Sequence, residues 1–463
     1  MYKDFRTYLD ALEKKGKLKR VVREVDKDWE LSTIARTVTI ISAPQRYGLL
    51  FEKIKGYKTP ASSNVFGSRD IYAIALETTA DKIFDRWVNA EKKPLAPKVV
   101  DQGPCKENVL KGNDIDLSKF PIPTWTPKKD PAPFITGGCA AMKDPETGWV
   151  NVGLYRYQVH DRDKLGISLL PGKDGTRILE KYASMGKPMP IAISIGPPPT
   201  VVMSSVAYIP FGTSEYEIAG ALAQAPIELT KCETTELLVP ATSEIVIEGE
   251  VDPKKLIMEG PFGEFLGYMG GASEKPYIQI KCITHRNNPI MHGLIEQKPP
   301  SEGGSILTLS LEVMMLQKLR ALGVPDVVGV CFTEPSAEMG IVISIKKRNA
   351  AHARQAMTAA WAAYPWGGKQ VIVVEDDCNI YDPFDVEWHI MTRCQPHRDV
   401  EIIRDFLGQP VDPSIPEEDV ERGSKMGIDA TRKYDYPSLA MPSKEMMHEV
   451  RSKWESYGLP PLG

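Results

Sequence analysis

Near the start of the chain, apolar residues recur at the spacing of one helical face. Asp4 is placed to cap this helix and Gly16 to end it. We therefore predict an N-terminal docking helix with the apolar positions Phe5, Tyr8, Leu9 and Leu12 on its buried face. From residue 95 to 133 the chain becomes rich in proline (LAPKVVDQGP, then FPIPTWTPKKDPAP), which favours extended and rigid backbone. This change in composition marks the border of a first domain.

Between residues 134 and 295 the pattern changes to short β-type runs separated by glycine and proline. Helical periodicity interrupts these runs at residues 176–185 and 214–225. The pattern predicts a β-barrel-like central domain with inserted helices.

The last third of the chain alternates helical and strand patterns. Helices are predicted at residues 305–323 and 349–363, with strands at VVGVCF, IVISIKK and QVIVVEDD, which indicates a third domain of α/β type. Ser443 caps a final helix whose apolar face needs a partner surface, on this subunit or on a neighbour. The apolar positions of this face are Met447, Val450, Trp454 and Tyr457.

Length and composition indicate an ordinary globular protein. The 463 residues exceed one core, so two or three domains packed as one body are expected. The chain is 42% hydrophobic and 25% charged, and its formal charge is −4, so nothing favours nucleic acid or an anionic membrane as a partner. No apolar run reaches the length of a signal peptide or a membrane span, and we expect a cytoplasmic protein. The seven cysteines include no CxxC pair, which favours reduced thiols.

The densest run of unusual features is MEGPFGEFLGYMGG. Here Glu259 and Glu264 flank a Pro-Phe-Gly turn that allows a tight reversal of the chain. Carboxylates held close together repel each other, which raises one pKa towards neutrality and creates a group able to transfer a proton. The alternative is a pair of solvated glutamates in a loop.

Three further runs carry candidate chemistry. In WVNVGLYR, Asn151 and Arg156 lie five residues apart on a predicted strand, and a buried arginine needs a carboxylate from the protein or from an acidic substrate. In TSEYEIAGA, Glu215 falls in the first turn of a helix, where the helix dipole alone accounts for it. In SLLPGKDGTRI, Lys173 lies near a helix start, a weak signal for phosphate binding.

The order and separation of these runs resemble the UbiD family of prenylated-flavin decarboxylases over nearly the whole chain. The runs that carry the resemblance are FPIPTWTPKKDPAPFIT, NVGLYR, KCETTELLVPATSEIVIEGEV, EGPFGEFLGY, VEDDCNIYDPFDVEWHIMTRC and GSKMGIDAT. The resemblance implies an α/β (α+β) fold in three parts. These are an N-terminal α/β domain at 1–120, a prenylated-FMN-binding split barrel at 121–305 and a C-terminal α/β oligomerisation domain at 306–440. A helix at 441–463 is expected to dock on a neighbouring subunit.

The resemblance also implies roles for the catalytic residues. Arg156 engages the substrate carboxylate and the flavin, Glu264 donates the proton that replaces CO₂, and Glu259 holds the arginine. The prenylated flavin bonds to the substrate and accepts the electrons released as CO₂ leaves. These roles agree with the chemistry of the three side chains.

Family members hold the flavin phosphate through a divalent metal, usually manganese, with potassium nearby. Asn151 and Glu215 match two of the metal ligands, while the histidine ligand falls on the PGKD run, where this chain has Lys173 or Asp174. A protonated lysine cannot ligate a metal, but its charge can neutralise a phosphate. We therefore treat Lys173 as a cofactor-binding candidate and leave the metal open.

The remaining site residues also rest on the resemblance. The flavin site is expected to include Thr136, Gly153, Tyr155 and Ser204, beside Asn151, Arg156, Lys173 and Glu215. Candidates for the substrate pocket are His292, Gln297 and Lys298 in MHGLIEQKPP. A histidine after a strand is more often hydrogen-bonded structure than a substrate ligand.

The implied function is reversible, non-oxidative decarboxylation of an aromatic acid, either hydroxybenzoate-like or heteroaromatic. A homo-oligomer, dimeric or hexameric, and a separate flavin prenyltransferase as the cofactor's source follow from the same resemblance. Two alternatives stay open: another lyase reaction on the same fold, such as a dehydration, and a non-catalytic flavin-binding assembly subunit.

Overall fold

The computed structural model describes residues 2–210 and 212–460. Helix α1 (Phe5–Lys14) begins where the sequence predicts, because the Asp4 carboxylate accepts a hydrogen bond from the Thr7 N–H at 2.8 Å. It packs on a four-stranded sheet in which a strand from much later in the chain lies at the edge. The strand order is β1 (Leu18–Val21), β2 (Gly48–Phe51), β3 (Ala61–Ser63) and β14 (Met291–His292). The other helices of this part are α2 (Glu30–Thr39), α3 (Arg69–Ala75) and α4 (Ile83–Lys92).

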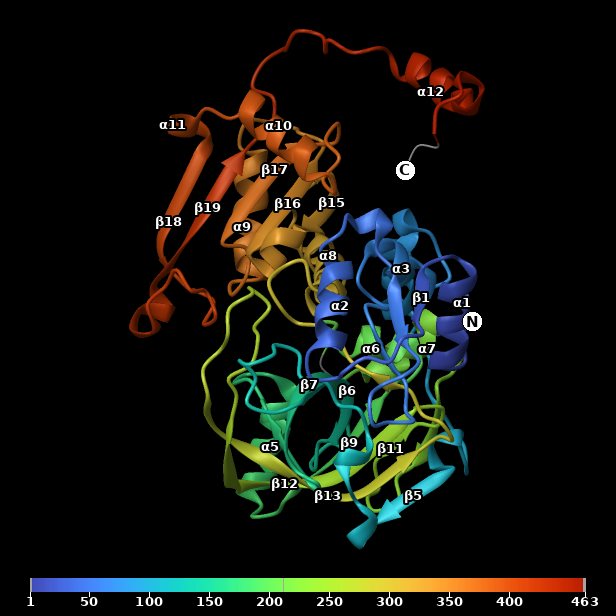
Figure 1. Cartoon of the computed structure of the whole chain (residues 1–463). Coiled ribbons are helices and arrows are strands. Elements are labelled where there is room, and N and C mark those ends of the chain that lie inside the picture. The colour runs from blue at the N-terminus through green and yellow to red at the C-terminus, as the bar shows by residue number, and fades with distance from the viewer. Residues whose placement is uncertain (1, 211, 461–463) are drawn as a thin grey trace.

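The centre of the molecule is a closed six-stranded antiparallel barrel, as the β-type runs predict (Figure 1). Around the barrel the strands are β12 (Ile245–Glu259), β9 (Met189–Ile195), β6 (Phe134–Lys143), β7 (Val150–Asp161), β8 (Lys164–Ile167) and β13 (Ser273–His285), and β13 pairs with β12 to close it. Strand β5 (Asn108–Lys111) extends the sheet beyond β13. A small sheet beside the barrel contains β11 (Leu238–Pro240), β10 (Glu228–Lys231) and β4 (Lys98–Val99). Helices α5 (Asp174–Ser184), α6 (Pro199–Ser204) and α7 (Glu215–Ala223) are inserted between strands.

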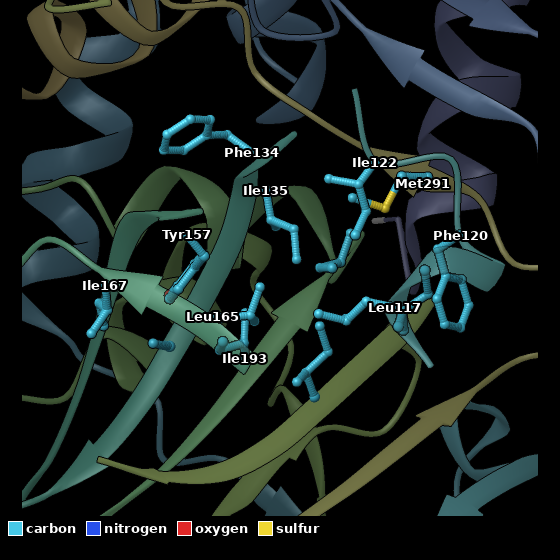
Figure 2. Packing of buried hydrophobic residues seen from close by; sticks show 14 of the residues in the cluster. Leu117, Phe120, Ile122, Phe134, Ile135, Tyr157, Leu165, Ile167, Ile193 and Met291 are labelled. Atoms are coloured by element: carbon cyan, nitrogen blue, oxygen red, sulfur yellow. The ribbon is translucent and has the colours of Figure 1, made fainter. Parts of the chain in front are cut away.

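Barrel closure gives this part of the molecule its own apolar core. Ile135, Tyr157 and Ile193 point inward from three neighbouring strands and are fully buried (Figure 2). Leu117, Phe120 and Ile122 extend the same cluster from the proline-rich segment. Strands β4 and β5 also precede residue 120 and still pair with β10 and β13, so the segments on either side of that position interleave.

The C-terminal part is an α/β layer, as the alternating pattern predicts. Its mixed sheet has the order β15 (Val327–Phe332), β16 (Gly340–Ile345), β17 (Gln370–Glu375), β19 (Gly423–Asp429) and β18 (Val400–Phe406). The helices are α8 (Glu302–Ala321), α9 (His352–Ala363), α10 (Pro383–Arg393) and α11 (Pro396–Asp399). Helix α8 links this layer to the N-terminal part: its Glu302 accepts from the Asn64 and Phe66 N–H groups, and its Glu312 pairs with Arg69 at 2.6 Å.

The tail helix α12 (Lys444–Ser452) lies apart from the body of the chain (Figure 1). Ser443 caps it as predicted, and none of its residues is buried. All seven cysteines are free thiols. Across the described residues, none of the helices combines the length and apolar character needed to cross a bilayer.

Candidate active site

Strand β7 carries four of the predicted site residues, Asn151, Gly153, Tyr155 and Arg156. The neighbouring strand β6 bulges opposite the last of them. Its register shifts between residues 135 and 138, so Thr136 and Gly137 both stand opposite Arg156. The even spacing of a regular ladder is therefore interrupted at the position of the arginine.

Arg156, Glu259 and Glu264 form one hydrogen-bonded network. Arg156 Nε and Nη2 donate to the two Glu259 carboxylate oxygens at 2.9 and 3.1 Å, and Nη1 donates to Glu264 Oε1 at 2.7 Å. The Glu259 side chain is 1% exposed, whereas that of Glu264 is 25% exposed. The Phe262 ring centre lies 5.4 Å from the guanidinium carbon. Glu264 is thus the acid of this network that solvent or a bound molecule can reach.

The guanidinium lies between the two carboxylates, and so it offsets the repulsion that the sequence predicts for a bare pair of glutamates. Burial lowers the pKa of Arg156, but the hydrogen bonds and charges of Glu259 and Glu264 outweigh it, and the net pKa is raised. The arginine is therefore permanently charged at this site.

The turn between the glutamates depends on small residues. The Gly260 N–H donates to Gln158 Oε1 at 2.7 Å, and the Glu264 N–H donates to the Tyr268 carbonyl at 2.8 Å. Gly267 has φ +90°, and a Cβ there would lie 2.4 Å from Lys298 Cα. The turn thereby packs against the 296–298 segment and holds Glu264 against the arginine.

Two further acids next to this network were missed by sequence reasoning. Burial raises the pKa of Asp130 to about 6, although hydrogen bonds from the Thr126 and Trp125 backbone and the charge of Arg156 oppose the shift. Burial also raises the pKa of Glu296 to about 8, and the charge of Glu264 adds to the rise. Glu296 is therefore protonated at neutral pH beside the exposed acid.

The Asn151 end of β7 contains polar groups without partners. Glu215 begins α7, and its Oε2 accepts a hydrogen bond from the Val152 N–H at 2.7 Å. Burial raises its pKa to about 8, and the charge of Asp174 adds to the shift. Asn151 is 5% exposed, and its side chain faces Tyr155, but its Nδ2 makes no hydrogen bond of ordinary length among the described residues. This end of the strand is polar, buried and incompletely bonded.

Lys173 and Asp174, the two candidates for the histidine position, differ in surroundings. Lys173 is exposed, and its Nζ donates a hydrogen bond to the Tyr208 hydroxyl at 2.9 Å. The same Nζ lies over the Tyr208 ring. Burial raises the pKa of Glu338, and the charge of Lys173 opposes this rise. Lys173 therefore faces Glu338 in the C-terminal layer. Asp174 is half-buried at the start of α5, and its charge acts on both Glu215 and Tyr155. The carboxylate, and not the ammonium, belongs to the Asn151 cluster.

The Asn151 cluster fits a divalent metal. It combines the Asn151 amide oxygen with two carboxylates, an all-oxygen donor set suited to Mn²⁺ or Mg²⁺, and the orphaned Asn151 Nδ2 can donate to a phosphate oxygen. The start of α5 and Lys173 lie beside it, which suits the phosphate end of a flavin nucleotide. The residues present therefore fit both groups that the sequence implies.

The other predicted flavin residues are small or already hydrogen-bonded. Thr136 Oγ1 accepts from the Leu294 N–H at 3.0 Å, and buried Ser204 donates to the Val201 carbonyl at 3.2 Å. The Tyr155 ring folds over Gly153, where a Cβ would lie 2.6 Å from the ring. Gly153 is therefore needed for the position of Tyr155.

The three substrate candidates have separate surroundings. His292 is fully buried in β14, between the rings of Phe5 and Phe66, and burial lowers its pKa to about 3. The His292 Nδ1 lies 3.2 Å from Ser62 Oγ, and its buried Nε2 has no hydrogen-bond partner among the described residues. The ring lies against Gly137, opposite Arg156, where a Cβ would be 2.9 Å from it. Gln297 Nε2 donates to the Trp125 carbonyl at 2.7 Å, and Lys298 is exposed beside the 260–270 turn. Only the last two lie against the segment that carries Glu264.

A cavity of about 400 Å³ opens near the far end of β7. Its lining includes Tyr57, Phe120, His160 and Arg162, and Arg156 is not part of it. Burial lowers the pKa of His160, and the charge of Glu259 opposes the shift. The cavity therefore lies next to the arginine network without forming part of it.

Comparison with known proteins assigns three successive parts of the chain to one family. Models of the N-terminal, Rift-related and C-terminal domains of 3-octaprenyl-4-hydroxybenzoate carboxy-lyase match residues 9–91, 98–299 and 305–430. The UbiD-class enzyme HmfF from Pelotomaculum thermopropionicum, solved with FMN, is 37% identical with a TM-score of 0.89, covering 96% of this chain and 98% of that one. An evolved dimeric form of HmfF with prFMN is 36% identical with a TM-score of 0.86, covering 95% and 97%.

A third solved structure extends the likeness to a named aromatic acid decarboxylase. Vanillic acid decarboxylase from Sedimentibacter hydroxybenzoicus, in its open form, is 32% identical with a TM-score of 0.89, and the match covers 99% of both chains. The likeness therefore includes the barrel, both flanking layers and the strand that carries Arg156. The chain belongs to the UbiD family and is a (de)carboxylating lyase.

Proposed function

We propose that this chain catalyses the reversible, non-oxidative decarboxylation of an aromatic carboxylic acid with prenylated FMN. The observation that carries the proposal is the Arg156 network, in which the Glu259 side chain is buried and the Glu264 side chain is partly exposed. Decarboxylation requires a cation that binds the substrate carboxylate and an acid that returns a proton to carbon. A permanently charged arginine beside an accessible glutamate meets both requirements.

In this proposal Arg156 binds and orients the substrate carboxylate. The two-point contact with Glu259 fixes the plane of the guanidinium, because both carboxylate oxygens are used. The Nη1 bond to Glu264 is the contact that a substrate carboxylate can replace, since it involves the more exposed partner. Glu259 is thus a positioning residue and Arg156 a binding residue.

Glu264 donates the proton that replaces CO₂. Its Oε1 accepts a hydrogen bond from Arg156 Nη1 at 2.7 Å, and a substrate carboxylate that binds at Nη1 would displace this contact. Glu296 lies close enough for the two charges to interact and holds a proton at neutral pH. We assign Glu296 as the group that restores the proton on Glu264 between turnovers.

Prenylated FMN supplies the electron sink when bound. In the proposal, Arg156 meets the reactive end of the cofactor, and Asn151, Lys173 and Glu215 meet its phosphate end. The residues proposed to line the cofactor between these ends are Thr136, Gly153, Tyr155 and Ser204. Support comes from the unpartnered amide of Asn151 and from the neighbouring proteins solved with FMN and prFMN. We further propose that Asn151, Glu215 and Asp174 ligate one divalent metal that neutralises the phosphate.

The substrate class in this proposal is a hydroxylated benzoate or a related heteroaromatic acid. The support is the likeness to a vanillic acid decarboxylase over 99% of both chains. Gln297 and Lys298, beside the Glu264 turn, are the residues of the substrate pocket that we retain. His292 is kept as a third candidate, because its buried Nε2 has no hydrogen-bond partner in the described part of the chain and its ring lies against Gly137.

The tail supports a homo-oligomer in which α12 docks on a second copy of the chain. Its exposed apolar side chains include Met446, Met447, Val450 and Tyr457, and an unpartnered amphipathic helix gains stability only by covering that face. Truncation after residue 440 should reduce the oligomer to smaller species in analytical ultracentrifugation. An unchanged mass would exclude the tail as the contact.

The direct test is to co-express the chain with a flavin prenyltransferase and to supply hydroxybenzoates and heteroaromatic acids in D₂O. Deuterium at the ring carbon that bore the carboxylate, formed together with CO₂, is the expected result. Folded protein that contains prenylated FMN but neither decarboxylates the acids nor exchanges label from bicarbonate would contradict the proposal. Loss of water from a substrate, without CO₂, would indicate a different lyase reaction.

A further inference from the structure

A group of potential metal ligands lies outside the barrel, at the end of the C-terminal layer. It consists of Cys378, Asp385 and His389, whose ligand atoms all lie within 4.8 Å of one another. Cys378 and His389 are 8% and 2% exposed, and the Asp385 side chain is 31% exposed. The reaction proposed above uses none of these three residues.

Local sequence brings the three side chains together. Asp385 and His389 are four residues apart on α10, so they share one face of the helix. Cys378 lies in the turn that precedes α10, and the Asn379 N–H of that turn donates to Asp385 Oδ2 at 2.6 Å. The turn is thereby held against the first turn of the helix, with the thiol beside the carboxylate.

The imidazole is buried without full hydrogen bonding. His389 Nδ1 lies 2.7 Å from the Asp385 carbonyl oxygen and 3.4 Å from its Oδ1, and Nε2 has no hydrogen-bond partner in the described part of the chain. A buried ring nitrogen without a partner is uncommon, because no hydrogen bond in the folded state offsets the free-energy cost of removing it from water. The ring can therefore ligate a cation through Nε2 as it stands, or through Nδ1 if Nδ1 gives up the Asp385 carbonyl.

The charges around the cluster leave room for a cation. Asp377 Oδ1 is 3.6 Å from His389 Nε2, but this carboxylate already pairs with Arg393 and Arg432. Glu375 lies beside the same arginines. Glu375 and Asp377 are thus neutralised by Arg393 and Arg432. Asp385, by contrast, pairs with no arginine or lysine among the described residues.

We propose that Cys378, Asp385 and His389 bind one Zn²⁺ ion, with water completing a tetrahedral shell. A thiolate, an imidazole and a carboxylate are the ligands that zinc prefers, and their two negative charges neutralise the ion. On binding, the Cys378 S–H bond breaks, a sulfur–zinc bond forms, and the proton goes to solvent, so no electrons change hands. The ligand atoms must draw together by about 1 Å to reach tetrahedral spacing, since zinc bonds are near 2.0–2.3 Å.

The rival explanation is an imidazole held between Asp377 and Asp385 without a metal. Both contacts are longer than hydrogen bonds, at 3.6 and 3.4 Å. The two explanations differ in the thiol: only metal binding recruits Cys378 sulfur as a ligand. The test therefore detects whether the Cys378 sulfur is bound to the metal.

The experiment uses the full-length protein, purified without a histidine tag, stripped with a chelator and titrated with Co²⁺ as a spectroscopic substitute for zinc. We expect a thiolate-to-cobalt charge-transfer band that saturates at one equivalent and disappears on addition of Zn²⁺. Cys378→Ala should abolish the band, and His389→Ala should weaken Co²⁺ binding by at least about tenfold. Cys394→Ala, at the other end of α10, is the matched control and should keep the band.

Two outcomes would overturn the proposal. One is the absence of a charge-transfer band in the wild-type protein; the other is a band that survives Cys378→Ala or is lost in Cys394→Ala. Should Cys378→Ala fail to fold, zinc-edge X-ray absorption on the zinc-loaded wild type replaces it, with one sulfur neighbour expected and none contradicting the site. Glu215→Gln, at the other metal cluster, should leave the band unchanged, so the result is independent of the flavin site.

Discussion

The two ends of strand β7 differ in how complete they are without a ligand. At Arg156 every charge has a partner, and the guanidinium is held on two sides at 2.7 to 3.1 Å. At the other end, the buried Asn151 Nδ2 has no hydrogen-bond partner in the described part of the chain, and the buried Glu215 carboxyl, with a pKa of about 8, is protonated at neutral pH. The two ends are five residues apart on one strand, so their difference is not a matter of fold.

The difference indicates that the Arg156 end is preorganised, whereas the Asn151 end needs a ligand to complete its hydrogen bonds. A network of opposite charges keeps its geometry in the empty protein, so the arginine end is ready for a substrate carboxylate. A buried group without a partner destabilises the protein until a ligand satisfies it. Substitutions at the arginine end should therefore affect turnover, and substitutions at the asparagine end should affect the binding of metal and cofactor.

The largest expected effect is at the arginine end. Glu264→Gln removes the proton donor but keeps a hydrogen-bond acceptor for Arg156, so decarboxylation should fall by about a thousandfold while flavin binding is unchanged. The measurement is turnover per bound flavin, together with the flavin content from the absorbance spectrum. Glu274→Gln, an exposed glutamate on β13, is the control. A variant that lost flavin instead of turnover would show that the two ends are not separate.

The next effect is at the asparagine end. Asp174→Asn removes a charged oxygen ligand from the proposed metal site, so Mn²⁺ affinity should fall by about 10- to 100-fold, with the secondary structure intact. Equilibrium dialysis with elemental analysis measures this without any substrate. Glu180→Gln, an exposed change on the same helix, should have no effect. Equal Mn²⁺ affinity in Asp174→Asn and wild type would remove Asp174 from the site.

A smaller effect concerns pH at the arginine end. Because Glu296 has a pKa of about 8 in the folded chain and 4.5 as its ordinary value, the folded state binds the extra proton between these pH values. The free energy of unfolding of the flavin-free protein should therefore fall as pH rises through this window. Glu296→Gln should remove up to about 1 kcal/mol per pH unit of that slope.

Denaturant unfolding at several pH values measures the Glu296 slope. Glu236→Gln, whose side chain is 82% exposed, is the control and should keep the wild-type slope. A slope that does not change in Glu296→Gln would show that Glu296 is ionised at neutral pH and cannot restore the proton on Glu264.

Sequence patterns predicted the elements of the fold better than their partners. The helix capped by Asp4, the barrel strands and the α/β layer follow from local periodicity, which is encoded in neighbouring residues. The pairing of β14 with β3 joins residues over 200 positions apart, and no local signal encodes it. His292 was named for the substrate pocket from the resemblance alone, and its ring contact with Phe5 of the N-terminal helix could not be predicted from the local sequence.

The site residues likewise divide into those that a local motif identifies and those that depend on contacts between distant segments. Arg156, Glu259 and Glu264 could be named from the resemblance, and their contacts depend on a single turn. Glu296 was passed over next to Gln297, because its raised pKa comes from burial and from the charges of Glu264 and Glu302, which only the folded chain brings near. Lys173 and Asp174 could not be separated from sequence, since adjacent side chains at a helix start point in directions that depend on the packing around them.

The smallest expected effect separates Lys173 from its neighbour. Its ammonium is exposed and bonded to Tyr208, so solvent screens its attraction for a phosphate, and Lys173→Met should weaken FMN binding by only about two- to fivefold. FMN fluorescence quenching in the presence of saturating Mn²⁺ measures this, with Lys187→Met near the end of the same helix as the control. Repeating the titration without metal sharpens the comparison, because a lysine that replaced the ion would matter more when the ion is absent. If Lys173→Met reduced FMN affinity more than Asp174→Asn does in parallel, the lysine would be the phosphate partner, and the asparagine end would bind its cofactor through charge on the protein itself.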